Sequence, residues 1–116
     1  MPFVTCMWNN NDATDAKKST MTAGIQKAMR EVGGVKAPIH VGYIDADYAA
    51  PLLQVWWTER PAEVVEATNA ALYEELKGCL TEEQVLCVIF TDIKRGSFGA
   101  NGEILNGKPD PSRGIY

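Results

Sequence analysis

The sequence predicts an α+β fold built from two consecutive β-α-β units and a short C-terminal hairpin. Three observations lead to this prediction: a strand-helix-strand pattern occurs twice, each occurrence opens on a proline, and a glycine-rich segment follows the second. The two prolines, Pro2 and Pro51, lie 49 residues apart, and His40 and Cys87 in the closing strands lie 47 residues apart. Because helical crossovers of this length join parallel strands, we expect parallel pairing within each unit.

The first unit covers residues 2–47. Its opening strand, 2–8, is rich in the β-branched, aromatic and sulfur-containing side chains that suit a strand covered on both faces. After a polar loop, Thr14 is a suitable N-cap for a helix, and the glycine pair at 33–34 ends that helix. The apolar positions at helical spacing, which predict one buried stripe, are Met21, Ile25, Ala28, Met29 and Val32. A second strand follows at 39–44.

The second unit covers residues 51–92 and repeats this pattern. Its first strand is 51–57, and Pro61 suits the first position of the following helix. The buried stripe of that helix is predicted at Val65, Leu72, Leu76 and Cys79. Residues 81–84 resemble a capping box that opens one short turn. The closing strand, 85–90, is a continuous apolar run, which is typical of a strand buried on both faces.

Two adjacent tryptophans, Trp56 and Trp57, lie in the predicted strand 51–57. Successive side chains of a strand point to opposite faces of a sheet. We therefore expect one of these indoles in the core and the other at an interface or a pocket wall. A small hairpin is predicted at 96–106, with Asn101 and Gly102 as its tight turn.

Composition limits the class of protein. The 116 residues suffice for one domain, which we expect to span 1–116. The net charge of −4 and the pI near 4.9 argue against a nucleic-acid partner, and no apolar segment has the length needed to span a membrane. Three cysteines without C-x-x-C spacing predict reduced thiols in a cytoplasmic protein. With a single histidine, we expect no metal site.

Pro2 is the first candidate for chemistry. Aminopeptidases commonly remove a methionine that precedes proline, which would leave a free secondary amine at the head of an apolar strand. Desolvation disfavours the charged form of an amine, so a buried Pro2 could be neutral near pH 7 and act as a base or nucleophile. The alternative is that Pro2 is an ordinary residue at the first position of a strand.

The hairpin carries a resemblance to a known family. The run Gly96-Ser97-Phe98-Gly99-Ala100-Asn101-Gly102-Glu103-Ile104, after a strand ending in Thr-Asp, resembles the C-terminal hairpin of 4-oxalocrotonate tautomerase. With Pro2 and the repeat, residues 2–106 resemble two such subunits fused head to tail, as in macrophage migration inhibitory factor and other large members of the tautomerase superfamily. The resemblance implies a (β-α-β)2 fold with a four-stranded sheet, two helices on one face and the hairpin. It also implies a homotrimer with shared sites and no cofactor.

The same resemblance implies roles for particular residues. Pro2 is expected to be the catalytic base that moves a proton on a small carboxylate-bearing keto or enol acid. Arg60 matches a family arginine that binds the substrate carboxylate, and Phe98 matches a phenylalanine that lines the pocket. His40 stands where 4-oxalocrotonate tautomerase has a second arginine. Lys36 lies near the position of a carboxylate-binding lysine in the cytokine-like relatives.

Alternatives stay open for these residues and for the function. His40 is equally explained as an ordinary strand histidine, Lys36 as a solvated loop lysine, and Arg60 as a rim arginine that neutralises Glu59 or Glu63. The first unit departs from the family because no arginine follows its opening strand. The rival functions are a non-catalytic trimeric binding module and a hydratase, dehalogenase or decarboxylase of the same superfamily. A ferredoxin-like α+β dimer with antiparallel pairing shares the β-α-β-β-α-β order and is the rival fold.

Overall fold

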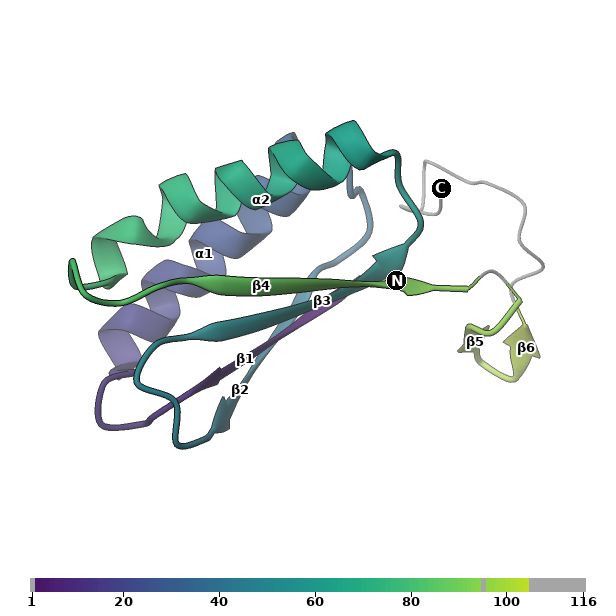
Figure 1. Cartoon of the computed structure of the whole chain (residues 1–116). Helices are drawn as coiled ribbons and strands as arrows, with labels where there is room; N and C mark the ends of the chain where they lie inside the picture. The colour runs from purple at the N-terminus through teal and green to yellow at the C-terminus, as the bar shows by residue number, and fades with distance from the viewer. Residues whose placement is uncertain (1, 95, 105–116) are drawn as a thin grey trace.

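The computed structural model describes residues 2–94 and 96–104 and has two layers, with both long helices on one face of a four-stranded sheet (Figure 1). In chain order the elements are β1 (Phe3–Trp8), α1 (Asp15–Glu31), β2 (His40–Asp45), β3 (Leu52–Thr58), α2 (Ala62–Leu76), the 3-10 helix η1 (Lys77–Cys79), β4 (Cys87–Ile93), β5 (Gly99–Ala100) and β6 (Glu103–Ile104). The predicted (β-α-β)2 class is confirmed. None of the helices in the described part of the chain could cross a bilayer.

The order of the strands in the sheet is β2-β1-β3-β4. β1 pairs with β2 in parallel, β3 pairs with β4 in parallel, and the antiparallel pair β1–β3 joins the two units. Parallel pairing within each unit is therefore as predicted. It also excludes the ferredoxin-like alternative, in which all the strands would pair antiparallel.

The helices cover only one face of the sheet, which corrects the prediction that strands 2–8 and 85–90 are covered on both faces. In β1, Val4, Cys6 and Trp8 point to the helices and are buried, whereas Phe3 is 39% exposed on the other side. Ile89 of β4 is 48% exposed on the same uncovered side, which we call the open face. Apolar residues on both sides of a strand therefore do not prove that both sides are buried in one chain.

The closing strand also begins later than predicted. β4 starts at Cys87, and Val85 lies before it with 70% of its surface exposed. The turn that precedes β4 uses the predicted capping pair: the Thr81 amide donates to Oε1 of Gln84 at 2.9 Å. Nε2 of Gln84 donates to the carbonyl of Ala49 at 2.7 Å. These bonds hold the turn at 81–84, and residues 85–86, which the apolar pattern assigned to the strand, lie between this turn and β4.

The two long helices begin and end close to the predicted signals. At the start of α1, the Thr14 hydroxyl accepts a hydrogen bond from the Lys17 amide at 3.3 Å. Shortly after the end of α1, Gly34 adopts the left-handed conformation, with a φ of 71°. Val32 lies beyond the last turn of α1 and is exposed, so its assignment to the buried stripe is wrong. In α2, the buried polar residue Thr68 was missed; its hydroxyl donates to the carbonyl of Val64 at 2.7 Å.

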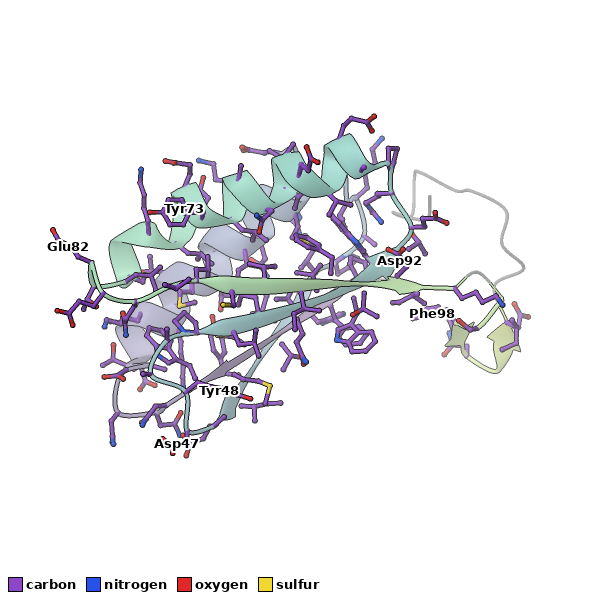
Figure 2. The ribbon with its side chains drawn as sticks, viewed as in Figure 1. Asp47, Tyr48, Tyr73, Glu82, Asp92 and Phe98 are labelled. Carbon is purple, nitrogen blue, oxygen red and sulfur yellow. The ribbon has the colours of Figure 1, made fainter. Side chains whose placement is uncertain are left out.

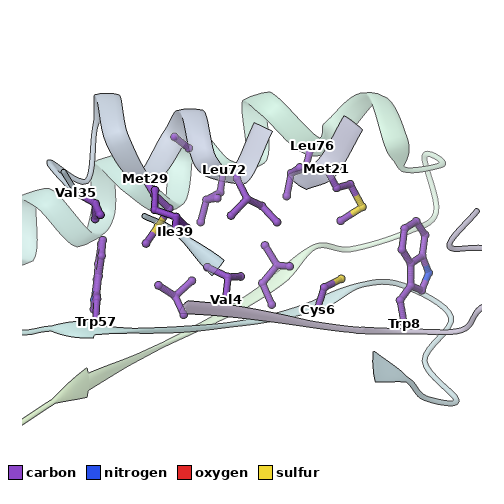
Figure 3. Packing of buried hydrophobic residues seen from close by; sticks show 14 of the residues in the cluster. Val4, Cys6, Trp8, Met21, Met29, Val35, Ile39, Trp57, Leu72 and Leu76 are labelled. Carbon is purple, nitrogen blue, oxygen red and sulfur yellow. The ribbon is translucent and has the colours of Figure 1, made fainter. Parts of the chain in front are cut away.

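The core lies between the helices and the sheet, with Trp57 and Trp8 at its opposite ends (Figure 3). Trp57 is fully buried there, below Val35. Trp56 lies on the open face, where its ring stacks on Phe3 with a centroid distance of 5.7 Å. The predicted division of the two tryptophans between the core and a more accessible surface is therefore confirmed.

The hairpin has the predicted turn. Asn101 and Gly102 have φ values of 50° and 81°, the left-handed pair that a two-residue type I′ turn requires. The hairpin extends away from the sheet beyond β4 (Figure 1). The predicted hairpin segment beyond Ile104, up to residue 106, lies outside the described residues.

Candidate functional site at one end of the sheet

The topology collects the predicted site residues at one end of the sheet. Pro2 precedes β1, Lys36 and His40 stand before and at the start of β2, Arg60 follows β3, and Phe98 follows β4. Because β1 and β3 run antiparallel, the start of β1 and the end of β3 meet at this end. We call it the proline end. Figure 2 shows Asp92 and Phe98 there, and Asp47 and Tyr48 at the opposite end of the sheet.

The opposite end is the counterpart of the proline end in the repeat, but its chemistry differs. At the opposite end, the nitrogen of Pro51 is part of an internal peptide bond. Cys87 occupies the position in the second unit that His40 occupies in the first. The loop after β1 is polar and acidic instead of cationic, and the amide of Asn10 donates to Oδ1 of Asp45 at 3.0 Å. Of the two ends, the proline end is therefore the one at which Pro2, the second residue of the sequence, and Arg60 both lie.

Pro2 is buried in an apolar setting. Phe3 is paired with Trp56 on β3 and with His40 on β2, so the register places Pro2 opposite Trp57 and Ile39. Both of these neighbours are buried. When Met1 is removed, the Pro2 nitrogen becomes a secondary amine in surroundings that solvate its charged form poorly.

Arg60 is 6% exposed, and backbone carbonyls hold its guanidinium. Nε donates to the carbonyl of Gly33 at 3.1 Å, and Nη1 donates to the carbonyl of Thr58 at 2.6 Å and to its hydroxyl at 3.2 Å. Gly33 follows the last turn of α1, where carbonyls point outward and the helix dipole favours a cation. These bonds fix a full positive charge below the protein surface.

Trp57 links Arg60 to the core. The guanidinium carbon lies 4.4 Å from the centroid of the Trp57 ring, a cation–π arrangement, and Phe90 packs 5.3 Å from that ring. A Cβ on Gly33 would lie 3.1 Å from Cζ3 of Trp57 and 2.6 Å from the carbonyl oxygen of Met29. The chain therefore needs glycine at position 33 for the end of α1 to approach the indole.

A cavity of about 660 Å³ opens beside Arg60 at the proline end. Its lining residues come from the β3–α2 loop and the end of β4, and are Glu59, Arg60, Pro61, Asp92, Ile93 and Lys94. Two cations and two carboxylates thus face one space. The site prediction included Arg60 but missed the other five, because only the pairing of β3 with β4 brings the two segments together.

The other predicted ligands lie at the same end but do not line this cavity in the described part of the chain. Lys36 is exposed in the loop before β2. His40 is exposed on the open face, in a row with Phe3 and Trp56. Phe98 is half-buried at the base of the hairpin. In one chain, therefore, Pro2 and Arg60 belong to the covered side of the sheet, and His40 to the open face.

The strand order, the two helices on one face and the hairpin define the fold as that of the tautomerase superfamily, so the resemblance predicted from the sequence is confirmed as a fold. No protein-family model and no curated protein matches the sequence. Solved structures do match it, and nearly all of the chain is covered in each of the following comparisons.

The F6 fused 4-OT (4-OT abbreviates 4-oxalocrotonate tautomerase), described as an asymmetric trimer, is similar with a TM-score of 0.72 and 16% identity over 89% of this chain and 95% of that chain. MIF2 from Leishmania major has a TM-score of 0.67 and 17% identity over 90% and 97%. Pt0534, solved after inactivation by 2-oxo-3-pentynoate, has a TM-score of 0.67 and 16% identity over 90% and 94%. At these identities the similarity shows the fold alone.

Proposed function

We propose that the protein is a tautomerase-like isomerase that moves a proton on a small α-keto, enol or unsaturated carboxylic acid, with Pro2 as the general base after removal of Met1. The observation that carries this proposal is the burial of Pro2 opposite Trp57 and Ile39, with the buried Arg60 guanidinium against the ring of the same Trp57. A base needs an unprotonated nitrogen, and apolar surroundings favour the neutral amine.

In the proposed reaction the Pro2 amine takes a proton from the carbon next to the substrate carbonyl. The electron pair of the broken C–H bond forms a carbon–carbon double bond while the carbonyl π pair moves to its oxygen, which gives an enolate with negative charge on that oxygen. The protonated Pro2 then returns the proton to a carbon of the product, which restores the neutral amine. A cation that binds the carboxylate holds the substrate and stabilises the developing charge. Of the predicted ligands, Arg60 lines the cavity, where Lys94 is a second cation, whereas Lys36 and His40 lie at the same end of the sheet without lining it.

We further propose a homotrimer in which neighbouring subunits complete each site. The open face supports this proposal, because Phe3, Ile44 and Ile89 expose 39%, 48% and 48% of their surface in the single chain. Such an exposed apolar surface is typical of an interface. His40 on this face and Phe98 on the projecting hairpin would then contribute to a pocket formed with another subunit. The trimers described for fused 4-OT proteins are consistent with this arrangement. A cytoplasmic location remains a prediction.

The proposal is tested with methionine-free protein and its Pro2→Ala variant. Ketonisation of phenylpyruvate or 2-hydroxymuconate is followed by absorbance, and we expect activity from the first protein and a loss of at least about 100-fold in the second, the lower range for general acid–base catalysis. Treatment with 2-oxo-3-pentynoate should leave an adduct at Pro2 that peptide mass spectrometry locates. Activity that is unchanged in Pro2→Ala would remove the proposed base.

A second candidate is hydration of an unsaturated carboxylate by the same site. The observation that favours it is the pair of carboxylates, Glu59 and Asp92, in the cavity beside Arg60, because a carboxylate can activate water. Water addition to 2-oxo-3-pentynoate, followed by proton NMR and lost in Glu59→Gln or Asp92→Asn, would favour this candidate over tautomerisation. Retained Met1 in protein from its native source, measured by intact mass spectrometry, would instead favour the non-catalytic binding module.

A further inference from the structure

We propose that Asp92 is a specificity-determining residue of the candidate site: it selects substrates that carry a positively charged group, such as an ammonium, in addition to the carboxylate. This inference rests on the proposed function, in which a cation at the proline end binds a small carboxylic acid. The substrate class is thereby narrowed to small zwitterions.

Asp92 lies beside the aromatic residue against which Arg60 packs. In the parallel pair β3–β4, Asp92 is the register partner of Trp57, and the side chains of directly paired residues stand on the same face of a sheet. The Arg60 guanidinium carbon lies 4.4 Å from the centroid of the Trp57 ring. On β1, the strand on the other side of β3, the register places Pro2 opposite Trp57. Trp57 therefore stands between Pro2 and Asp92 in the sheet, with the guanidinium against its ring.

The cavity beside Arg60 has a surplus of negative charge in the rest of its lining. Among the described residues, its other charged members are Glu59, Asp92 and Lys94, two carboxylates and one ammonium. Neither carboxylate forms an ion pair with a residue that the structure describes. When a substrate carboxylate binds Arg60, the remaining lining therefore keeps a net negative charge. A positively charged group on the same substrate would balance it.

Asp92 is better placed than Glu59 or Lys94 to set this preference. Its backbone is fixed by the pairing of β4 with β3, whereas Glu59 lies in the loop after β3 and Lys94 follows the last residue of β4. A short aspartate side chain loses less conformational entropy on binding than a lysine with its flexible four-carbon stem. Asp92 is exposed at the proline end, so a ligand can reach its carboxylate without a change in the fold (Figure 2).

A dicarboxylate is the opposite possibility, and the charges of the lining argue against it. Lys94 is the cation that would be left for a second substrate carboxylate after Arg60 has bound the first. That second carboxylate would enter the same cavity as Glu59 and Asp92. Like charges brought together in this way oppose binding. The lining therefore favours a cationic group over a second anionic group.

The experiment compares three ligands that differ only in the group at the end of one carboxylate-bearing chain: 6-aminohexanoate ends in an ammonium, heptanoate in a methyl group and pimelate in a second carboxylate. None has a keto group, so none is turned over. Binding to ¹⁵N-labelled, methionine-free protein is followed by NMR, and the shifted amides locate the ligand. We expect the preference for 6-aminohexanoate over heptanoate to fall about fivefold in Asp92→Asn, the upper range for a solvent-accessible ion pair. Pimelate should bind the wild type more weakly than 6-aminohexanoate does.

Asp47→Asn is the matched control, because Asp47 is also exposed but lies at the opposite end of the sheet (Figure 2). This variant should keep the wild-type preference. The inference is overturned if Asp92→Asn keeps the preference as well, if Asp47→Asn loses it to the same extent, or if pimelate binds the wild type more tightly than 6-aminohexanoate. Shifted amides that all lie away from the cavity would also overturn it. Because no ligand reacts, each of these results is independent of whether Pro2 is the base.

Discussion

The carbonyl of Gly33 accepts a hydrogen bond from Nε of Arg60 at 3.1 Å, although 27 residues separate them in the chain. This bond ties the end of α1 to the loop after β3. Trp57 packs between these two segments, and the strand register places it opposite Pro2. The same three residues thus support both the fold at the proline end and the chemistry proposed for it.

Replacing Arg60 should reduce stability. Arg60→Met removes three hydrogen bonds and leaves the carbonyl of Gly33 without this donor in the core, so we expect a loss of about 2–4 kcal/mol in the free energy of unfolding. Urea unfolding followed by tryptophan fluorescence measures it. The control, Arg30→Met, changes an exposed arginine and should stay within about 0.5 kcal/mol of the wild type. If Arg60→Met lowers the free energy of unfolding no more than the control does, the hydrogen bonds of the buried guanidinium make no net contribution to stability.

Gly33→Ala tests the close approach of α1 to the indole. The new Cβ would lie 2.6 Å from the Met29 carbonyl oxygen, which is backbone and cannot rotate away, and 3.1 Å from Trp57. We expect a destabilisation of about 1–3 kcal/mol and a change in the Trp57 emission spectrum. Gly78→Ala is the matched control, because a Cβ at Gly78 meets nothing within 4 Å and alanine there costs no unusual backbone conformation. Gly78→Ala should leave the free energy of unfolding unchanged or raise it by up to about 1 kcal/mol.

The thiols should differ sharply in reactivity. Burial raises the pKa of Cys6 from its ordinary value of 9.0 to about 12, while Cys87 is exposed on the open face. At pH 8, a disulfide reagent such as Ellman's should modify Cys87 first in monomeric protein and Cys6 only after unfolding. Cys87→Ser should abolish the fast phase. Rapid modification of Cys6 in the folded state would contradict the burial that the structure gives it.

The raised pKa of Cys6 also predicts that the free energy of unfolding depends on pH. Because the folded state favours the neutral Cys6 thiol, this contribution is fully present below about pH 9 and is lost as the pH rises toward 12, where the unfolded chain ionises more readily. Chemical unfolding at pH 8, 9.5 and 11 measures the slope. In Cys6→Ala the alkaline slope should be shallower than in the wild type. Equal slopes in the two proteins would assign the alkaline loss to other groups, such as Tyr43, whose pKa burial also raises.

The open face should be needed for assembly and not for the fold of one chain. Ile89→Lys places a charge on that face, at a side chain that is 48% exposed in the monomer. We expect a smaller species by analytical ultracentrifugation with an unchanged far-UV circular dichroism spectrum. Tyr73→Lys, an equally exposed position on the outer surface of α2, is the control and should keep the wild-type mass. A wild-type protein that sediments as a monomer would contradict the proposed trimer.

Much of the fold could be predicted because its signals are local. The Thr14 cap, the left-handed Gly34 and the Asn101-Gly102 turn each fix a short segment through its own backbone chemistry. Covered and open faces could not be separated in the same way. An apolar residue that faces the helices, such as Val88, and one that faces away, such as Ile89, have the same kind of side chain.

The site was predicted less completely for a related reason. The sequence indicated Pro2 and Arg60 separately, but their common neighbour, Trp57, depends on the register between β1 and β3, which belong to different units. Likewise Glu59 and Asp92 share a cavity only because β3 pairs with β4. Register between distant strands follows from how the whole sheet packs, and no short stretch of sequence carries it.

The most direct test of the account is the pKa of the Pro2 amine in the wild-type protein without Met1, measured by ¹⁵N NMR. An N-terminal amine in water has a pKa of about 7.7–8.0. We predict a value well below this range, because Pro2 is buried and the register places it opposite the buried side chains of Trp57 and Ile39. A value within or above it would mean that the amine is mostly protonated at neutral pH, and the proposal that Pro2 acts as the base would then be contradicted.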